Sequence, residues 1–163
     1  MPPIHVNALI NQGALLFLPK DASEKLASRG MAMIKGTMNG FPFQAVVEPN
    51  GKGSHWFRVT GTLREGARVT IGDTVSLEIE PSNVWPEPKV PVDLKTTLET
   101  EPEAYSLWQD ITPMARWDWI RWIGATKVAE TRKRRIVVTC SKLSAGKRRP
   151  CCFNLTECTL TDA

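Results

Sequence analysis

The stretch that decides the fold of the first half of the chain is MAMIKGTMNGFPFQAVVE, residues 31–48. Asn39-Gly40 near its centre is a strong short signal for a two-residue hairpin turn, because both residue types tolerate the positive φ angles that such a turn requires. Apolar and β-branched residues flank the turn on both sides. The stretch therefore predicts two antiparallel strands.

Further short strands are predicted on both sides of this hairpin. GALLFLP (13–19) is an apolar run that Pro19 ends, SHWFRVTG (54–61) alternates, and TVSLEIE (74–80) places its three apolar side chains on one face. About five short strands within about 70 residues predict a small barrel or sandwich. DASEKLASRG (21–30) predicts one or two helical turns that Gly30 ends, and we expect His5 to lie in a tail.

A proline-rich segment, PSNVWPEPKVP (81–91), follows the strands. Its four prolines exclude a central strand or a helix, so it predicts an extended, fairly stiff linker. The expected organisation is a β domain at 1–82, a linker at 83–92, a basic helical domain at 93–150 and a tail at 151–163.

The helical domain opens at two capping signals. Thr100–Glu103 has the pattern of a capping box, and Thr112 before Pro113 predicts the start of the next helix. On a helical wheel one broad arc of that helix is apolar, while Asp118 and Arg121 are predicted to face solvent. The apolar arc consists of Ala115, Trp119, Ile120, Trp122 and Ile123.

The last helix lies within ETRKRRIVVTCSKLSAG, residues 130–146. Ala129, Ile136, Cys140 and Leu143 form a narrow apolar stripe, and Gly146 predicts the C-terminal end. Consecutive basic residues spread about 100° apart around a helix axis, so they cannot all face one groove.

Charge is distributed unevenly along the chain. The 163 residues are 42% hydrophobic and 23% charged, which is typical of a globular protein, and the net charge is +4. Residues 112–150 hold 11 Lys and Arg against two acidic residues, whereas residues 1–111 hold 10 against 13. So polarised a segment favours an anionic partner such as nucleic acid or an acidic protein surface; solubility is the competing explanation.

Candidate contacts for such a partner follow from the basic stretch. Arg132 and Arg135 flank the apolar stripe and suit a phosphate or carboxylate clamp. Arg116 falls inside the apolar arc and needs a carboxylate or stacking partner. None of these residues predicts readout of bases. The full set is Arg116, Trp117, Arg132, Arg135, Lys147, Arg148 and Arg149.

The four cysteines do not predict a metal site. Their spacing, C-x10-C-C-x5-C, is not a standard zinc pattern. Cys140 lies on the apolar stripe and predicts a small core residue. Cys151 and Cys152 follow two arginines, so they are weak candidates for reactive thiols, although inert thiols are the favoured interpretation.

Catalytic groups are sparse in the sequence. Neither His5 nor His55 has a serine or cysteine partner that the sequence places beside it, and no glycine-rich phosphate loop occurs. We therefore expect no catalytic, cofactor or metal site. No apolar run reaches about 18 residues, and the N-terminus is a poor signal peptide, so the expected location is the cytoplasm.

The second half of the chain resembles a known family. TPMARWDWIRWIGATK (112–127), ETRKRRI (130–136) and LSAGKRRPCCF (143–153) resemble the YdeI/OmpD-associated family, also described as bacteriocin-protection proteins. Val128 departs from the proline that the family pattern places before the ETR motif. The resemblance implies no catalytic residues.

The first half resembles a β-barrel domain of unknown function that often precedes this family. The matching pieces are KGTMNGFPF (35–43), IGDTV (71–75) and VPVDL (90–94). The resemblance implies an α+β protein in which a small N-terminal barrel of the double-split type is followed by a C-terminal helical domain.

Three functional hypotheses follow. The first is a non-enzymatic binding protein that contacts nucleic acid or another anionic partner through the basic helix. The second is a protein-interaction module in stress or envelope resistance, which docks its partner on the barrel or on Trp117. The third is a small-molecule binder or thiol enzyme that uses Cys151 or Cys152 in a cleft between the domains. Open strand edges would also let the barrel pair into a homodimer.

Overall fold

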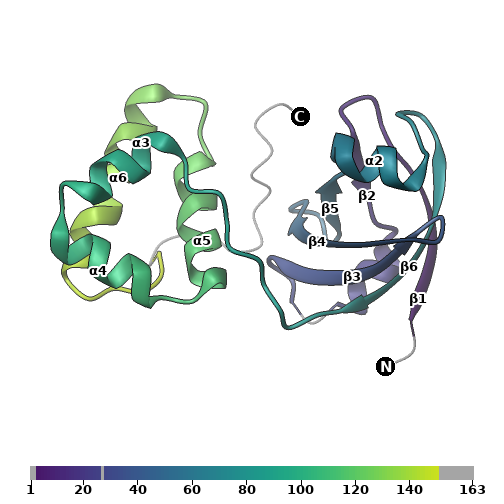
Figure 1. Cartoon of the computed structure of the whole chain (residues 1–163), viewed down its shortest axis with the longest axis horizontal. Helices are drawn as coiled ribbons and strands as arrows, with labels where there is room; N and C mark the ends of the chain where they lie inside the picture. Colours follow the sequence, from purple (N-terminus) through teal and green to yellow (C-terminus); the bar gives the residue numbers. More distant parts are fainter. Residues whose placement is uncertain (1–2, 27, 151–163) are drawn as a thin grey trace. The chain divides into compact units, whose positions relative to one another are not determined.

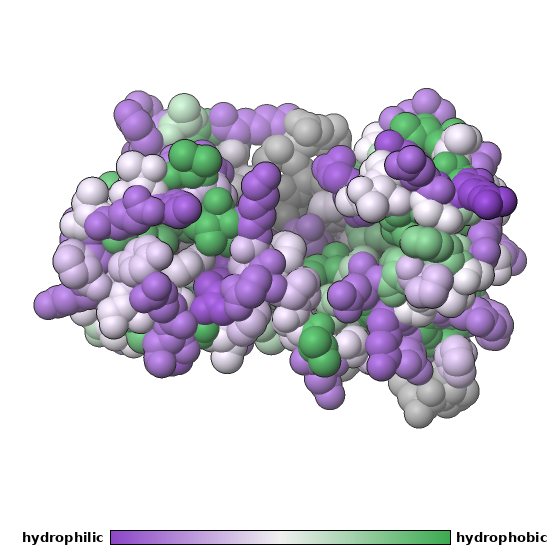
Figure 2. All heavy atoms as spheres, in the orientation of Figure 1, coloured by the Kyte–Doolittle hydropathy of each residue, from purple (hydrophilic) through white to green (hydrophobic). Residues whose placement is uncertain are grey.

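The structure is a computed structural model that describes residues 3–26 and 28–150. These residues form two compact units, the first ending at Val84 and the second beginning at Trp85. The first unit contains the strands and the second contains four helices (Figure 1). On the face drawn in Figure 2, hydrophilic residues dominate, and hydrophobic residues appear in separate patches between them.

Six antiparallel strands build the first unit. Their order in the sheet is β1-β6-β3-β4-β5-β2, and the two end strands meet again at a bridge between Ile10 and Leu16. The strands therefore form a nearly closed barrel, as predicted. Their bounds are β1 Ile4–Leu9, β2 Leu15–Phe17, β3 Ala32–Met38, β4 Phe41–Pro49, β5 His55–Arg58 and β6 Thr74–Pro81.

The predicted hairpin is confirmed as β3 and β4. Asn39 has a φ angle of 48° and Gly40 one of 83°, as a two-residue hairpin turn requires. The alternation of the last strand is also confirmed, because Val75, Leu77 and Ile79 are at most 1% exposed and lie in the barrel core.

The N-terminal segment is not the tail that the sequence suggested. Residues Ile4–Leu9 form β1 and pair with β6 from Ile79 to Thr74. His5 lies on this strand, exposed, with Nε2 3.1 Å from Glu78 Oε1. The prediction was wrong although Ile4, Val6 and Ala8 alternate with His5 and Asn7, because so short a run has little strand propensity of its own and forms a strand through pairing with β6.

Two short helices complete the barrel unit. α1 (Lys20–Glu24) lies where helical turns were predicted, although it ends well before Gly30. α2 (Gly61–Ala67) was not predicted; the hydroxyl of its N-cap residue Thr60 accepts a hydrogen bond from the backbone N–H of Leu63.

The helical unit packs four helices around one core. α3 spans Val92–Glu99, α4 Pro102–Asp110, α5 Pro113–Gly124 and α6 Ala129–Ser144. The core includes Leu94, Leu98, Ala104, Trp108, Ile111, Ala115, Trp119, Ile123, Ile136, Cys140 and Leu143. The predicted order of a barrel followed by a helical region is thus confirmed, and α3 is an additional helix that the sequence did not signal.

The two predicted capping signals have different outcomes. Thr112 caps α5, since its Oγ1 accepts a hydrogen bond from the backbone N–H of Ala115 at 3.1 Å. The capping box at Thr100 is wrong: Glu101 is the N-cap residue of α4 and makes no side-chain capping bond. Pro102 at the first helical position fixes the start instead.

The apolar arc of α5 is confirmed only in part. Ala115, Trp119 and Ile123 are buried, but Asp118 is only 2% exposed and Arg121 only 5%, so the prediction that these two face solvent is wrong. α5 is surrounded by structure on more sides than its hydrophobic pattern indicates.

Candidate functional site

The predicted candidate residues all lie in the helical unit, and most of them bind other parts of that unit. Arg132 of α6 grips Asp93 at the start of α3 with two hydrogen bonds, Nε to Oδ2 at 2.7 Å and Nη2 to Oδ1 at 3.0 Å. The hydrogen bonds from Arg132 lower the pKa of Asp93, and the same contact raises the pKa of Arg132. This bidentate pair fastens α6 to α3.

Arg135 is held against α5. Its Nη1 donates to the carbonyl oxygen of Trp122 at 2.7 Å, and its guanidinium carbon lies 5.4 Å from the centre of the Trp122 ring. A cation over an indole face is stabilised by the ring quadrupole. The guanidinium therefore occupies the face of Trp122 on which a base would have to stack.

Arg116 has the carboxylate partner that its position in the apolar arc required. Its Nε donates to Glu87 Oε2 at 3.1 Å, Nη2 pairs with the other oxygen of Glu87, and Nη1 donates to the carbonyl oxygens of Trp108 and Ile111. The Arg116 side chain is only 10% exposed. Arg116 is thus a buried connector between the proline-rich segment and α4–α5.

Trp117 anchors the same proline-rich segment. Its indole Nε1 donates to the carbonyl oxygen of Pro86 at 2.9 Å, and the residue is half-buried. The segment between Pro81 and Val92 contains no helix or strand. It is nevertheless tied to α5 at both Pro86 and Glu87.

The segment after α6 is fastened to α4 and α5. Arg148 donates to Asp110 through Nη1 to Oδ2 at 2.9 Å and through Nη2 to the carbonyl oxygen at 3.2 Å, while Trp119 Nε1 donates to the Arg148 carbonyl oxygen at 3.0 Å. Arg149 pairs with the carboxylate of Asp118. Lys147 is exposed, and its side chain makes no ion pair with any described residue.

Asp118 is a buried carboxylate on α5. Burial raises its pKa, and the charge of Arg149 and its hydrogen bond oppose that effect. Asp118 is 2% exposed, whereas the Arg149 side chain is 46% exposed. If the pair were lost, water could solvate Arg149 but not Asp118, so most of the free-energy cost would come from the buried carboxylate. Arg149 is therefore committed to Asp118.

The predicted residues thus do not converge on one phosphate clamp. Arg116, Arg132, Arg148 and Arg149 pair with carboxylates of the linker, α3, α4 and α5. The sequence did not single out Lys133 and Arg134, which are exposed on the outer side of α6 and make no ion pair with a described residue. Their position in the middle of a consecutive basic run was the available signal, since residues about 100° apart around a helix cannot all face the core.

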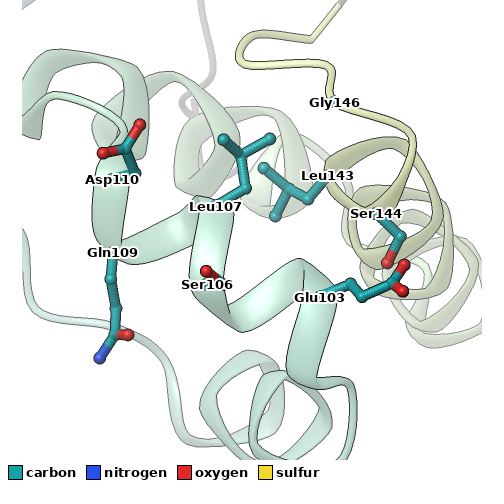
Figure 3. A pocket seen from close by; sticks show the side chains of 8 residues that line it. All are labelled: Glu103, Ser106, Leu107, Gln109, Asp110, Leu143, Ser144 and Gly146. Atoms are coloured by element: carbon teal, nitrogen blue, oxygen red, sulfur yellow. The ribbon is translucent and has the colours of Figure 1, made fainter.

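A groove of about 480 Å³ lies between α4 and the end of α6 (Figure 3). Leu107 and Leu143 point toward each other at its centre, and Glu103 and Ser144 lie beside each other at one end. Asp110, which lines the opposite end, is the partner of Arg148.

The barrel unit contains a buried serine–histidine pair that the sequence analysis missed. Ser23 Oγ and His55 Nδ1 are 2.5 Å apart, and His55 Nε2 is 2.7 Å from the carbonyl oxygen of Gly30. Burial lowers the pKa of His55, and the hydrogen bond to Gly30 opposes it. Since Ser23 is 0% and His55 1% exposed, the pair joins α1 to β5 and is closed to substrate.

The thiols offer little chemistry within the described residues. Cys140 is 5% exposed, and burial followed by the charge of Glu101 raises its pKa, so the prediction of a core cysteine is confirmed. Cys151 and Cys152 lie outside the described residues.

Within residues 3–26 and 28–150, no group of three or more His, Cys, Asp or Glu side chains is arranged to hold a metal ion. In the same ranges, no helix combines the length and hydropathy of a bilayer-crossing segment.

Comparison with known families separates the chain at the same place as the structure. Residues 87–146 match the family described as Bacteriocin-protection, YdeI or OmpD-Associated, and residues 4–79 match a domain of unknown function, DUF1905. No curated protein matches the chain. The helical unit is therefore similar to the YdeI or OmpD-associated bacteriocin-protection family, and the barrel that precedes it in the chain is similar to DUF1905.

Proposed function

We propose that the chain is a binding protein that holds an anionic partner, nucleic acid in the first instance, through the exposed cations of α6 and of the segment that follows it. The observation that carries the proposal is the set of exposed cationic side chains that form no hydrogen bond or ion pair with a described residue. On α6 and just after it, these are Lys133, Arg134 and Lys147.

The energetics of the ion pairs decide which further cation is free to bind. Arg148 and Asp110 are 50% and 70% exposed, and such surface pairs contribute about 0–1 kcal/mol. Arg148 can therefore exchange Asp110 for a phosphate at little cost. Arg116 and Arg149 cannot do so, because removing either leaves buried polar groups without a partner.

The proposed contact surface thus consists of Lys133, Arg134, Lys147 and Arg148, which we call the free-cation set. Its members are two ammonium and two guanidinium groups, so the surface suits a chain of phosphates rather than a particular base sequence. The family description refers to bacteriocin protection. The proposal includes a role in bacteriocin protection that depends on this contact.

A salt titration tests it. Labelled duplex and single-stranded DNA and RNA are titrated with wild type and with a variant in which all four residues of the free-cation set are changed to Ala. Four phosphate contacts on duplex DNA predict a slope of log affinity against log salt of about −3.6, and the variant should lose that slope.

The matched control removes four cations from the barrel unit. Lys20, Lys25, Lys35 and Lys52 are exposed, and changing them to Ala alters the net charge equally. The control should bind like wild type. Equal loss in both variants would show that net charge alone matters, and absence of binding at low salt would reject nucleic acid. Polyglutamate as the competitor then distinguishes an acidic protein surface.

A further inference from the structure

The outer side of α6 presents a continuous stripe to solvent. Its members recur every three or four residues and are all exposed, so they share one helix face. They are Glu130, Lys133, Arg134, Val137, Ser141 and Ser144. Val137 stands out, because a valine that is 63% exposed in the middle of a helix contributes nothing to its own core.

A hollow of about 370 Å³ lies against this valine. Residues from three elements line it, so it is a depression between α6 and the corner that joins α3 to α4 rather than a gap along one helix. The lining residues are Thr97, Glu101, Val137, Cys140, Ser141 and Ser144. The face therefore carries an apolar projection directly beside a hollow.

Opposite charges lie at the two ends of the same face. Lys133 and Arg134 lie at one end, where they outnumber the single acidic residue Glu130. Glu101 and Glu103, which line hollows that both include Ser144, lie at the other end. At a rise of 1.5 Å per residue, the cations are about 16 Å from Ser144 along α6. In the part of the chain that the structure describes, none of these charges forms an ion pair.

This arrangement is complementary to itself. A two-fold axis that passes between Val137 and Ser141 would lay two α6 helices antiparallel, with Val137 of each copy opposite Ser141 and the hollow of the other. The same rotation places Lys133 and Arg134 opposite Ser144, where Glu101 and Glu103 lie. Such self-complementarity is what an isologous interface requires.

We propose that this face binds a second copy of the chain and that the helical units pair through it. Charge complementarity at both ends selects another copy, because a uniformly charged partner would meet like charges at one end. The contact is small and has a charged rim, so the dimer is salt-sensitive. The inference goes beyond the proposed function and does not depend on it; polyanions would compete with the second copy for Lys133 and Arg134.

Reciprocal charge reversal tests the pairing by sedimentation equilibrium at low salt. One full-length variant carries Lys133→Glu and Arg134→Glu, and the other carries Glu101→Lys and Glu103→Lys. Each variant alone brings like charges together at both ends, so its dissociation constant should rise at least about tenfold. An equimolar mixture unites an acidic face with a basic face and should recover a dimer that contains one copy of each.

A third charge-reversal variant is the control. Lys20→Glu with Lys25→Glu produces the same change in net charge in the barrel unit and should dimerise like wild type. Wild type that stays monomeric at every concentration overturns the proposal. A dimer that both single variants retain overturns it too, because another surface then holds the copies together. Two monomeric variants that stay monomeric when mixed also refute it, provided that circular dichroism shows both folded.

Discussion

Gly36 is the position in the barrel where one added methyl group should be most damaging. A Cβ atom built on Gly36 would lie 1.8 Å from the carbonyl oxygen of Glu78 and 2.8 Å from the Cα of Ile79, both on the backbone of β6. Cβ atoms essentially never approach other atoms closer than 3.0 Å, so Gly36→Ala requires β3 and β6 to separate by at least 1.2 Å, the difference between these two distances.

That separation breaks the ladder between two central strands. A backbone hydrogen bond of about 2.9 Å stretched by this amount is no longer a bond, and each bond lost in this way costs about 1–3 kcal/mol. Loss of the two bonds around Gly36 and its partner Ile79 predicts a cost of about 2–6 kcal/mol. For a unit of this size the melting temperature should fall by at least about 10 °C.

Thermal unfolding followed by circular dichroism measures the effect, with Gly13→Ala as the matched control. A Cβ on Gly13 would meet only Asn11 Oδ1 at 3.4 Å and Leu15 Cγ at 3.9 Å, and the residue does not need a left-handed backbone. The control should therefore stay within about 0.5 kcal/mol of wild type, or gain slightly through a more restricted unfolded chain. A Gly36→Ala protein that melts with the control would refute the close approach of β3 and β6.

Three further predictions concern buried polar groups. Arg116→Met should destabilise the helical unit by about 2–4 kcal/mol in urea titrations, because two buried backbone carbonyls lose their donor. Arg149→Ala should lower the free energy of unfolding by about 1–3 kcal/mol at neutral pH and by less in acid, because the pKa of Asp118 is raised and a protonated carboxyl needs no cation. An equal loss at both pH values would contradict this. Burial lowers the pKa of His55 from its ordinary value of 6.5, so the unfolded chain binds the proton first as the pH falls. Barrel stability should therefore decrease as the pH is lowered through about 6.5, and His55→Gln should flatten that slope in denaturant titrations.

Local signals predicted the strands whose conformation is fixed by their own residues. Asn39 and Gly40 specify their turn through backbone angles, and β6 shows its buried face through strict alternation, so both were evident in the sequence. β1 and α2 were not, because their stability comes from pairing and packing with distant segments, and a single sequence does not display those contacts.

The candidate site was harder to predict than the fold. A basic run has the same composition whether its arginines face a partner or fasten helices together, and the deciding carboxylates lie far away in sequence. Asp93 is 39 positions from Arg132, and Asp118 is 31 from Arg149. The pairing of Arg116 was the exception, because a charge inside an apolar arc must be neutralised within the structure.

The serine–histidine pair could not be predicted either, because its two residues are also far apart in sequence. Ser23 is 32 positions from His55, and neither residue stands in a recognisable motif. Only the folded barrel brings α1 against β5 and shows that the pair is structural.

The single bridge between Ile10 and Leu16 gives the barrel a seam with defined exchange behaviour. The strands on either side of it, β1 and β2, are consecutive in the chain and joined by a tight turn, in which the N–H of Ala14 donates to the carbonyl oxygen of Asn11 at 3.0 Å. β1 and β2 can therefore separate at the seam while all the other strand pairs stay intact. Amide protons of β1 and β2 that face the seam should exchange with deuterium through this local opening, well before those of β3 and β6, whose exposure requires the whole barrel to unfold.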